Sequence, residues 1–414
     1  MKTAAHPPSA HEVFRVVSES ASMMFSGGEL KTKEADTSAG FAVRALVDGR
    51  LGFAYCQEEH ELKKTLDAAA KASHYSEKTK FSFAPKAHYI IPDSYDEALQ
   101  PDDYPALRGM VEEARSAAES RGGKARIMLS AERGAVELRN SEGFSGSYRK
   151  TDFSIYAECM HGDGYGFAYL SSCKRPKEVH SVGQKAADMA KAMHGATKPE
   201  SGTHTVVFEL SVLAELFDIL MPSFSGDWKR RKMTKLQRDR KAFSEKFTLC
   251  EDGFAHASAL RPFDDEGTPS KRRILVERGF VKSFLYDRET AALEGTNASG
   301  ACARGSYDSP PSLSSSNLVV SPGTWESVSE LGKHIELHSA HGSHTANVTT
   351  GDFGMEASVA FLVDGAKRTP LKGFMVTGNI FELFANVEAM ERKQQVHDSL
   401  ISPRIAFRDV RIVS

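Results

Sequence analysis

Four histidines within eleven residues form the densest group of possible metal ligands in the sequence: His334, His338, His341 and His344. Imidazole nitrogens bind zinc and related metals, and two histidines four residues apart on a helix share one face. We expect a helix over Trp325 to His338, which would place the first two histidines in this way. The spacing matches no compact zinc module, and a solvated helix end is the alternative. We therefore predict no metal ligands in this chain and keep the histidine cluster as the competing hypothesis.

The acidic triplet Asp264, Asp265 and Glu266 lies between Pro262 and the Gly267 to Pro269 turn. Two neighbouring carboxyl groups could act as a general acid and a general base. An acidic turn whose carboxylates accept hydrogen bonds from nearby backbone amides is the commoner use of such a segment. The punctuation by proline and glycine favours this turn.

Other catalytic templates are incomplete. Gly143-Phe-Ser-Gly-Ser lacks the last glycine of a nucleophile elbow, and Gly162-Asp-Gly-Tyr-Gly lacks the spacing of a dinucleotide fingerprint. His11-Glu12 has no second histidine at Arg15, so it is not a zincin helix. We predict tight turns at the glycines and no catalytic residues in this chain.

The basic run from Trp228 to Lys241 could bind phosphates or an acidic partner. It contains one aromatic residue and therefore no stacking platform for bases. The whole chain has 53 Lys and Arg against 55 Asp and Glu, so no overall field attracts nucleic acid or an anionic membrane. We predict a solvated or subunit-facing segment, with no nucleic acid and no membrane as partner.

The length of 414 residues, with 40% hydrophobic and 26% charged residues, indicates an ordered protein of more than one domain. The polar stretch from Thr197 to Gly202 is the expected boundary, which gives an N-terminal domain over 1–196 and a C-terminal domain over 203–414. The five cysteines are scattered without a C-x-x-C pair, and no signal-like or membrane-spanning run is present. We expect a cytoplasmic location.

The elements that must position these residues alternate between helices and strands. A tight turn at Asp48-Gly49 predicts a hairpin of two strands, and Arg126 to Ser172 is strand-like. Apolar spacing predicts helices over Ala10–Phe25, Glu58–His74, Tyr104–Arg121, Ser181–His194, Ser211–Met221 and Ile380–Ala385.

A second hairpin is expected where Ile274 to Val276 turns at Glu277–Gly279 and returns from Val281 to Tyr286. Asp287 is placed to cap a helix over Glu289–Leu293, and Gly295 to end it. The mixture predicts an α+β fold with two domains, in which helices pack on antiparallel or mixed sheets.

Several segments together resemble the TldD/PmbA family, whose members act as paired subunits of zinc-dependent peptidases. They read PFDDEGTPS from Pro262, LYDRETA from Leu285, Asn317-Leu-Val-Val, Thr350-Gly-Asp-Phe and Thr377-Gly-Asn. The resemblance covers Thr203 to Ser414 well and the N-terminal half in outline. It implies a two-domain TldD/PmbA-like architecture, with a C-terminal domain of mostly strands and some helices.

The catalytic members of that family carry H-E-x-x-x-H on a helix, followed by Gly-Asp-aromatic. Gly226-Asp227-Trp228 resembles the trailing signature, and counting back places Phe217, Asp218 and Pro222 at the motif positions. Phenylalanine and proline offer zinc no side-chain lone pair. The catalytic members also carry a cysteine near the C-terminus, whereas Cys302 is the last one here. The resemblance therefore implies a PmbA-type, TldE-like subunit without zinc, whose TldD-type partner supplies the metal.

The resemblance further implies a heterodimer, with a homodimer as the alternative, that cleaves unfolded peptides for maturation or degradation. This chain would help to enclose an extended peptide by sheet-edge addition. The expected surface comprises Thr350, Gly351, Asp352, Phe353, Thr377, Gly378 and Asn379. Buried turns of the scaffold are the alternative for these residues. For the whole chain, the alternatives are a hydrolase that acts alone and a purely regulatory binding protein.

Overall fold

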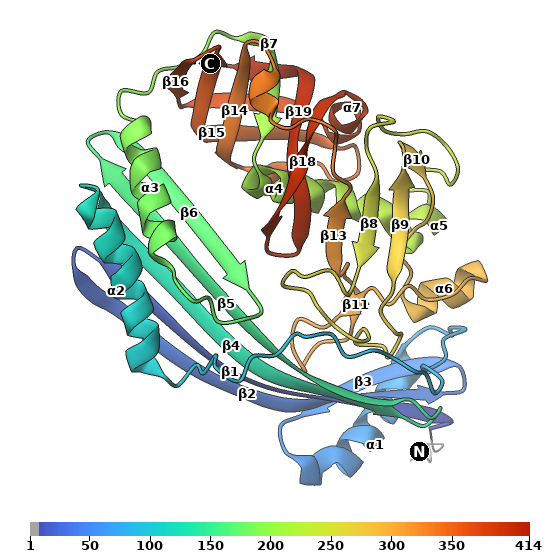
Figure 1. The fold of residues 1–414 in the computed structure, drawn as a ribbon. Helices are drawn as coiled ribbons and strands as arrows, with labels where there is room; N and C mark the ends of the chain where they lie inside the picture. The colour runs from blue at the N-terminus through green and yellow to red at the C-terminus, as the bar shows by residue number, and fades with distance from the viewer. Residues whose placement is uncertain (1–7) are drawn as a thin grey trace.

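The chain forms two large sheets that face each other (Figure 1). Among the contacts between their layers, Phe263 packs against the first sheet, and Met193 packs against Val359 and Phe361 of the second. This computed structural model describes residues 8–414, apart from the side chain of Ser329, so residues 1–7 of the predicted N-terminal domain lie outside the described part. The first sheet is antiparallel, with the strand order β3-β2-β1-β4-β5-β6. Its strands are β1 (Ala10–Ser26), β2 (Glu29–Val47), β3 (Arg50–Cys56), β4 (Lys124–Asn140), β5 (Ser145–His161) and β6 (Gly164–Ser172).

Three helices cover one face of the first sheet: α1 (Leu62–Ala72), α2 (Tyr104–Ser120) and α3 (His180–Ala192). Met23 and Phe25 of β1 pack with α2 and α3, whereas Phe14 packs on the opposite face with Phe263 of the C-terminal half. Successive side chains of a strand point to opposite faces, so odd and even positions of β1 serve different cores. Among the described helices, none is long and apolar enough to cross a membrane.

The helix predicted over Ala10–Phe25 is wrong, because this segment is strand β1. The apolar residues of β1 are divided between two covered faces, so the sequence shows no clean alternation with period two. Val13, Val16 and Val17 consequently mimic helical spacing. Burial of both faces of one strand is a property of the assembled fold.

The second sheet is mixed and has eleven strands within the described residues. β7 pairs in parallel with β14 and antiparallel with β19, which closes the strands β7, β14, β15, β17 and β19 into a ring. The sheet comprises β7 (Gly202–Phe208), β8 (Leu249–Asp252), β9 (Arg272–Glu277), β10 (Phe280–Val281), β13 (Asn317–Val320), β14 (His334–His341), β15 (Asp352–Asp364), β16 (Lys367–Leu371), β17 (Phe374–Asn379), β18 (Val387–His397) and β19 (Leu400–Val413). The predicted α+β class with mixed sheets is confirmed.

The remaining elements are shorter. A separate small pair consists of β11 (Cys302–Ala303) and β12 (Ser312–Leu313). The helices of this half are α4 (Leu210–Leu220), α5 (Gly226–Arg230), α6 (Arg288–Glu294) and α7 (Ile380–Ala385). Single 3-10 turns are η1 (Glu59–Glu61), η2 (Ser73–Tyr75), η3 (Met221–Phe224), η4 (Val328–Glu330) and η5 (Ser343–Thr345).

Local punctuation accounts for the elements that the sequence predicts well. Arg278 and Gly279 both have positive φ, 47° and 81°, and turn β9 into β10 as the hairpin predicts. The Asp287 carboxylate accepts a hydrogen bond from the backbone N–H of Thr290, and Gly295 ends α6 with φ 65°. By contrast, the helix predicted over Trp325–His338 is wrong, because the segment forms η4 and the start of β14.

Gly166 of β6 lets α3 approach the edge of the first sheet. A Cβ at this position would lie 2.3 Å from both the Ala186 oxygen and the Ala190 nitrogen of the α3 backbone. Since backbone atoms cannot move aside without shifting the helix, Gly166→Ala is expected to lower the free energy of unfolding by about 1–3 kcal/mol. Urea denaturation measures this loss. Gly109→Ala is the control, because no atom lies within 4 Å of its added Cβ; an equal effect of both variants would contradict the close packing.

Candidate functional site

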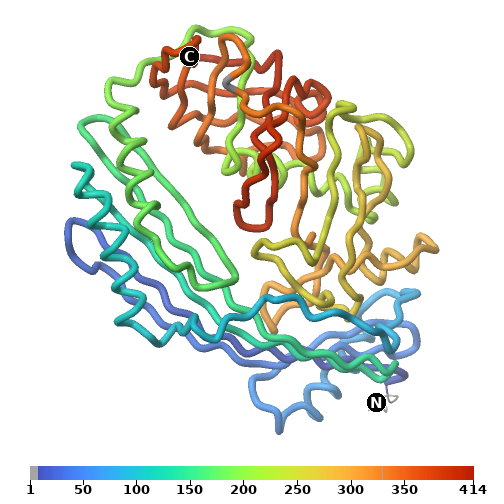
Figure 2. Tube along the Cα trace, in the orientation of Figure 1, coloured from blue at the N-terminus to red at the C-terminus, as the bar shows by residue number. Residues whose placement is uncertain are grey.

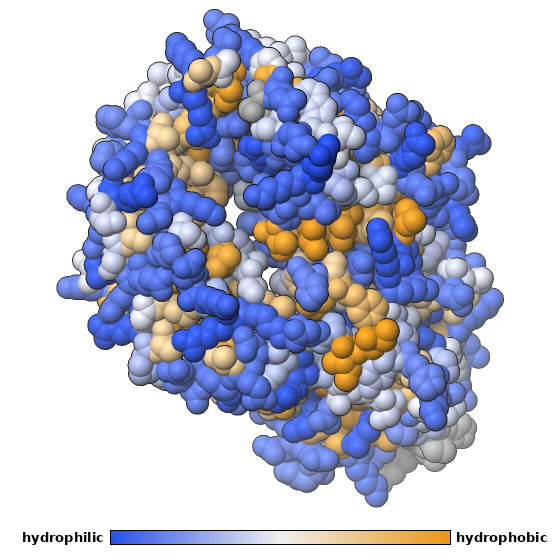
Figure 3. All heavy atoms as spheres, viewed as in Figure 1, coloured by the Kyte–Doolittle hydropathy of each residue, from blue (hydrophilic) through white to orange (hydrophobic). Residues whose placement is uncertain are grey.

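A cleft lies between the β6 edge of the first sheet and the second sheet. It encloses a cavity of about 470 Å³, a size that fits part of a peptide or a small ligand. Figure 3 shows the molecule hollowed between its two halves, with apolar side chains gathered beside the hollow. Its walls come from β6, α3, the start of α4, β14, β15, β16 and the end of β18: Phe167, Ala168, Tyr169, Lys185, Asp188, Met189, Ala192, Glu209, Leu210, Ser211, His338, Phe361, Arg368, Gln395, Val396 and His397.

β6 contributes an unpaired strand edge to this cleft. It is the last strand of its sheet, and the described residues provide no strand partner on its outer side. An added Cβ at Gly164 or Gly166 would strike α3, so the even positions face that helix, and Tyr169 at an odd position contacts the second sheet. A strand edge of this kind can pair with an extended peptide through backbone hydrogen bonds.

The tip of the β18–β19 hairpin reaches across to β6 (Figure 2). Gln395, Val396 and His397 of this hairpin line the cleft. The Tyr169 and His397 rings lie 5.0 Å apart, and the backbone N–H of Asp398 donates to the Ser171 hydroxyl at 3.2 Å. The Tyr169 hydroxyl also donates to the Asp398 carboxylate. Val396 at the tip is 52% exposed, so an apolar side chain is presented to the cavity.

A charged group forms the opposite wall. Burial opposes ionisation of Glu336, but His338, Arg368 and Arg404 outweigh it and lower the pKa of Glu336 to about 2. The Arg368 guanidinium lies 2.9 Å from the Glu336 carboxylate and stacks on the Phe361 ring, with 3.6 Å between the guanidinium carbon and the ring centroid. This wall combines a fixed charge pair with an aromatic surface, as sites for polar backbones and apolar side chains do.

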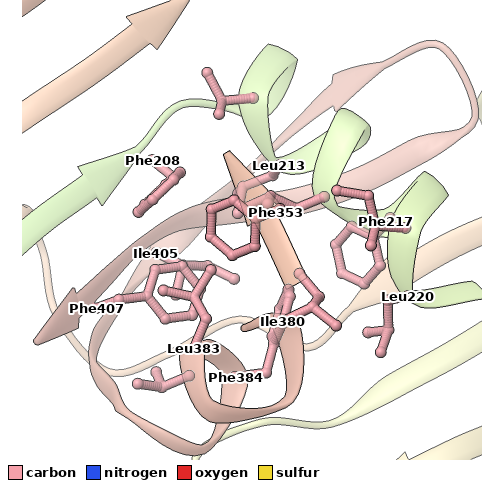
Figure 4. Packing of buried hydrophobic residues seen from close by; sticks show 14 of the residues in the cluster. Phe208, Leu213, Phe217, Leu220, Phe353, Ile380, Leu383, Phe384, Ile405 and Phe407 are labelled. Atoms are coloured by element: carbon pink, nitrogen blue, oxygen red, sulfur yellow. The ribbon is translucent and has the colours of Figure 1, made fainter. Parts of the chain in front are cut away.

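The positions that correspond to the H-E-x-x-x-H motif lie at the end of α4 and just beyond it. Phe217 is 2% exposed and its ring lies 5.4 Å from that of Phe384, in the packing that Figure 4 shows. Asp218 is the only carboxylate of the three positions, and burial raises its pKa, which favours the protonated form. Pro222 begins the 3-10 turn after the helix. One carboxyl group and two apolar side chains do not fit a zinc ion, which needs several N, O or S ligands.

A buried cluster of charged residues joins the two sheets. Arg44 of β2 lies 2.8 Å from both the Glu12 and the Glu266 carboxylates, and Arg304 lies 3.1 Å from Glu12. Each of these four side chains is 4% exposed or less. Burial raises the pKa of Glu12, while Arg44 and Arg304 oppose this effect. Through the ion pair between Glu266 and Arg44, the PFDDEGTPS segment binds the C-terminal half to the first sheet.

Asp264, Glu266 and Cys302 are the one group of side chains in residues 8–414 whose ligand atoms lie close enough together to share a metal ion. The two carboxylates already have other partners. Asp264 accepts hydrogen bonds from the backbone amides of Glu266 and Thr268 at 3.0 and 2.8 Å, and the Glu266 carboxylate forms an ion pair with Arg44. Burial raises the pKa of the Cys302 thiol well above its ordinary value. A protonated thiol beside a cation does not fit a metal site, and the acidic triplet serves as the turn that its punctuation favours.

We expect Asp264 to make the free energy of unfolding depend on pH. Burial, together with the neighbouring Glu266 charge, raises its pKa in the folded protein despite the opposing Arg261 and backbone amides. The folded state therefore keeps a proton that the unfolded chain releases above about pH 4. The contribution of Asp264 to the free energy of unfolding is expected to fall as pH rises from about 4 toward neutrality. Urea denaturation across this range measures the slope.

Asp264→Asn removes the titrating group and keeps an oxygen for the Glu266 and Thr268 amides, so the slope should become shallower. Asp188→Asn is the matched control, because Asp188 is half-exposed and forms a surface ion pair with Arg121. An unchanged slope in Asp264→Asn would show that other groups cause the dependence.

The four histidines are not gathered as the helix hypothesis requires. His334 and His338 both lie on β14, where a separation of four residues spans about 13 Å, too far for one ion. His334 is buried with Nδ1 2.8 Å from the Gly332 oxygen, while His338 faces the cleft. His341 lies beside Ser358, and His344 is on η5. The prediction that His334 and His338 share one face of a helix is wrong, because both lie on strand β14.

The residues predicted to contact peptide lie side by side but outside the cleft. Asp352 is opposite Asn379 in the β15–β17 pair, Phe353 opposite Gly378, and Thr377 opposite Gly354. The Asn379 amide donates to the Asp352 carboxylate at 2.8 Å and to the Thr350 backbone oxygen at 2.9 Å. The bond from Asn379 to Asp352 and a second one from the Thr350 hydroxyl lower the Asp352 pKa. Gly351 packs against Phe381 and Ile380. β17 is paired on both sides, by β15 and β19, and peptide contact by this group stays a prediction.

Sequence reasoning missed the cleft itself. Tyr169, Val396 and His397 meet across more than two hundred residues of chain, and none belongs to a motif. The one local signal is an apolar valine in the otherwise polar run Arg392 to Asp398. Such a residue is too common on protein surfaces to mark a site by itself.

Three domain models of one protein family match most of the chain. Residues 201–414 match the model of the PmbA/TldA metallopeptidase C-terminal domain, 11–73 match domain 1 and 93–193 match the central domain. An uncharacterized protein of Methanocaldococcus jannaschii is 29% identical over 96% of this chain and 95% of its own length. A protein of Methanothermobacter thermautotrophicus named metalloprotease is 25% identical over 90% of this chain and 86% of its own length.

The fold has a close counterpart among solved structures. The crystal structure of TldE from Thermococcus kodakarensis is similar with a TM-score of 0.89 and 22% identity, and the match covers 98% of this chain and 97% of that one. The family models together span both sheets, the α4 region and the cleft. The chain therefore belongs to the TldD/PmbA family of metallopeptidase-like proteins.

Proposed function

We propose that this chain is a non-catalytic, TldE-like subunit of a TldD/TldE-type zinc metallopeptidase complex. A TldD-type partner supplies the zinc, and this chain helps to bind and enclose an extended, unfolded peptide. The observation that carries the proposal is Phe217, a fully packed aromatic side chain at a position where the catalytic members place a metal ligand. Refilling that position with a ligand would open a hole in the core around Phe384.

The cleft supports the peptide-holding role. The free edge of β6 offers backbone donors and acceptors, which recognise an extended chain with little dependence on its sequence. Val396 and Phe361 provide apolar contacts, and the Arg368–Glu336 pair provides polar ones. Enclosure between two sheets admits an unfolded segment and excludes a folded domain. The segments around Asp352 and Asn379 form a second candidate contact surface outside the cleft.

The test is reconstitution with a TldD-type subunit bearing H-E-x-x-x-H, from the same source. The isolated chain, the isolated partner and the mixture are assayed for cleavage of an unfolded peptide, with and without a chelator. Size-exclusion chromatography with light scattering measures the stoichiometry of each sample. We expect chelator-sensitive cleavage by the mixture and a mixed dimer.

The other outcomes separate the alternatives. Cleavage by the isolated chain would overturn the proposal in favour of a hydrolase that acts alone. Formation of a complex without cleavage of unfolded peptides in any sample would favour a regulatory binding protein. A stable homodimer that ignores the partner would contradict the heterodimer.

A further inference from the structure

A second cavity, remote from the cleft, lies among α5, β9 and the end of α6 and has a volume of about 460 Å³. Its lining contains four basic side chains and one acidic one: Lys229, Arg238, Lys271, Arg273 and Glu294. Hydroxyl and amide side chains of Ser283, Thr296 and Asn297 complete the polar wall. The chain as a whole is close to neutral, so this concentration of positive charge is local.

The acidic groups nearby pair with three of the four basic side chains and leave Lys271 over. Glu294 is bound to Lys229, and Asp239 lies 3.8 Å from Arg238. Arg273 is 12% exposed, and its Nη1 donates to the Ser299 oxygen at 2.8 Å and lies 3.5 Å from Glu251. Among the described residues, Lys271 has no ion-pair or hydrogen-bond partner. Burial and the neighbouring Arg273 lower the Lys271 pKa, and Glu251 opposes this effect only in part.

We propose that this cavity binds a small molecule that carries phosphate groups. Arg273 approaches from β9 and Lys271 from the residue just before it, Lys229 from α5 and Arg238 from the segment that follows α5. The donors therefore converge from different directions. A tetrahedral phosphate accepts hydrogen bonds in several directions, whereas a carboxylate accepts in one plane. The volume suits a ligand of a few groups rather than a duplex.

The adjoining basic residues do not extend the cavity into a nucleic-acid surface. Arg230 lies 2.7 Å and Arg231 2.8 Å from the Asp227 carboxylate, so both are paired locally. Neither lines the cavity. Part of the basic run thus belongs to a bounded site, whereas Arg230 and Arg231 form exposed ion pairs.

Isothermal titration of the full chain with pyrophosphate tests the proposal, with citrate at equal ionic strength as the multivalent carboxylate. We expect saturable pyrophosphate binding that is tighter than citrate binding and weakens with added salt. Lys271→Gln should weaken it about tenfold, since one charge-assisted contact is lost. Lys271 is exposed and forms no hydrogen bond or ion pair that the substitution would remove, so folding should be unaffected.

Arg272→Gln is the matched control, because Arg272 is the next residue in the chain, is also exposed and does not line the cavity. It should leave the affinity unchanged. Tighter binding of citrate, the absence of saturable pyrophosphate binding, or an equal loss in both variants would each overturn the proposal. Duplex DNA that binds more tightly than pyrophosphate would do the same.

Discussion

Replacement of Arg44 by leucine is expected to lower the free energy of unfolding by about 3–5 kcal/mol, the cost of leaving buried charges without their partner. Arg44 is 3% exposed and lies 2.8 Å from both Glu12 of β1 and Glu266 of the PFDDEGTPS turn in the C-terminal half. Leucine fills part of the volume but leaves the two carboxylates with fewer cations. Urea denaturation at pH 7, followed by circular dichroism, measures the loss.

The matched control is Arg15→Leu on the neighbouring strand. Arg15 also lies 2.8 Å from a carboxylate, that of Glu137, but both side chains are about half exposed. Exposed pairs contribute about 0–1 kcal/mol, so the control should lose far less stability. If Arg44→Leu lowers the free energy of unfolding no more than Arg15→Leu does, the buried ion pairs of Arg44 do not stabilise the fold as proposed.

The pH dependence of the Arg44→Leu variant gives an independent check. Burial already raises the Glu12 pKa, and removal of Arg44 takes away the largest opposing charge. A carboxyl group whose pKa is raised on folding stabilises less as pH rises from its unfolded value, about 4.3, toward its folded value. The penalty of the variant should therefore shrink when the pH is lowered from 7 to about 4.5.

Replacement of Val396 by aspartate is expected to reduce peptide cleavage by the reconstituted complex about tenfold. Val396 is 52% exposed at the hairpin tip and lines the cleft, so a charge there must lose water when an apolar peptide side chain arrives. A penalty of about 1.4 kcal/mol corresponds to that factor. The ratio kcat/KM for an unfolded peptide is the measurement, and it rests on the proposed function.

Val413→Asp is the control for this variant. It makes the same chemical change at a 41% exposed valine outside the cleft. The free energy of unfolding of both variants should lie within about 0.5 kcal/mol of that of the parent, as is usual for substitutions at exposed positions. Equal activity of the two variants would remove the hairpin tip from the peptide path. If cleavage fails in both because the complex no longer forms, light scattering shows it directly.

The most distinctive segment of the sequence proves to be structural. PFDDEGTPS supplies Phe263, whose ring packs 5.1 Å from Phe144, and Glu266, which pairs with Arg44. Asp264 accepts hydrogen bonds from the backbone amides around it. The segment therefore joins the two sheets that form the walls of the cleft.

The sequence by itself determined the features that depend on neighbouring residues. Asp48-Gly49 and Arg278-Gly279 adopt positive φ and specify two hairpins, and Asp287 and Gly295 delimit α6. The family resemblance further predicts that Phe217 stands where the catalytic members carry a metal ligand, and the family itself is confirmed. These features are local in the chain, where turn and capping chemistry is readable.

Tertiary structure alone decided which faces are covered and which distant residues meet. β1 carries apolar residues on two faces because helices pack on one and Phe263 on the other, and this coverage hid its period of two. β14 is a strand because it completes the ring between β7 and β15, which places His334 and His338 too far apart for one ion. The cleft exists because the β18–β19 hairpin reaches the free edge of β6. Contacts of such long sequence separation arise from packing, and no local pattern encodes them.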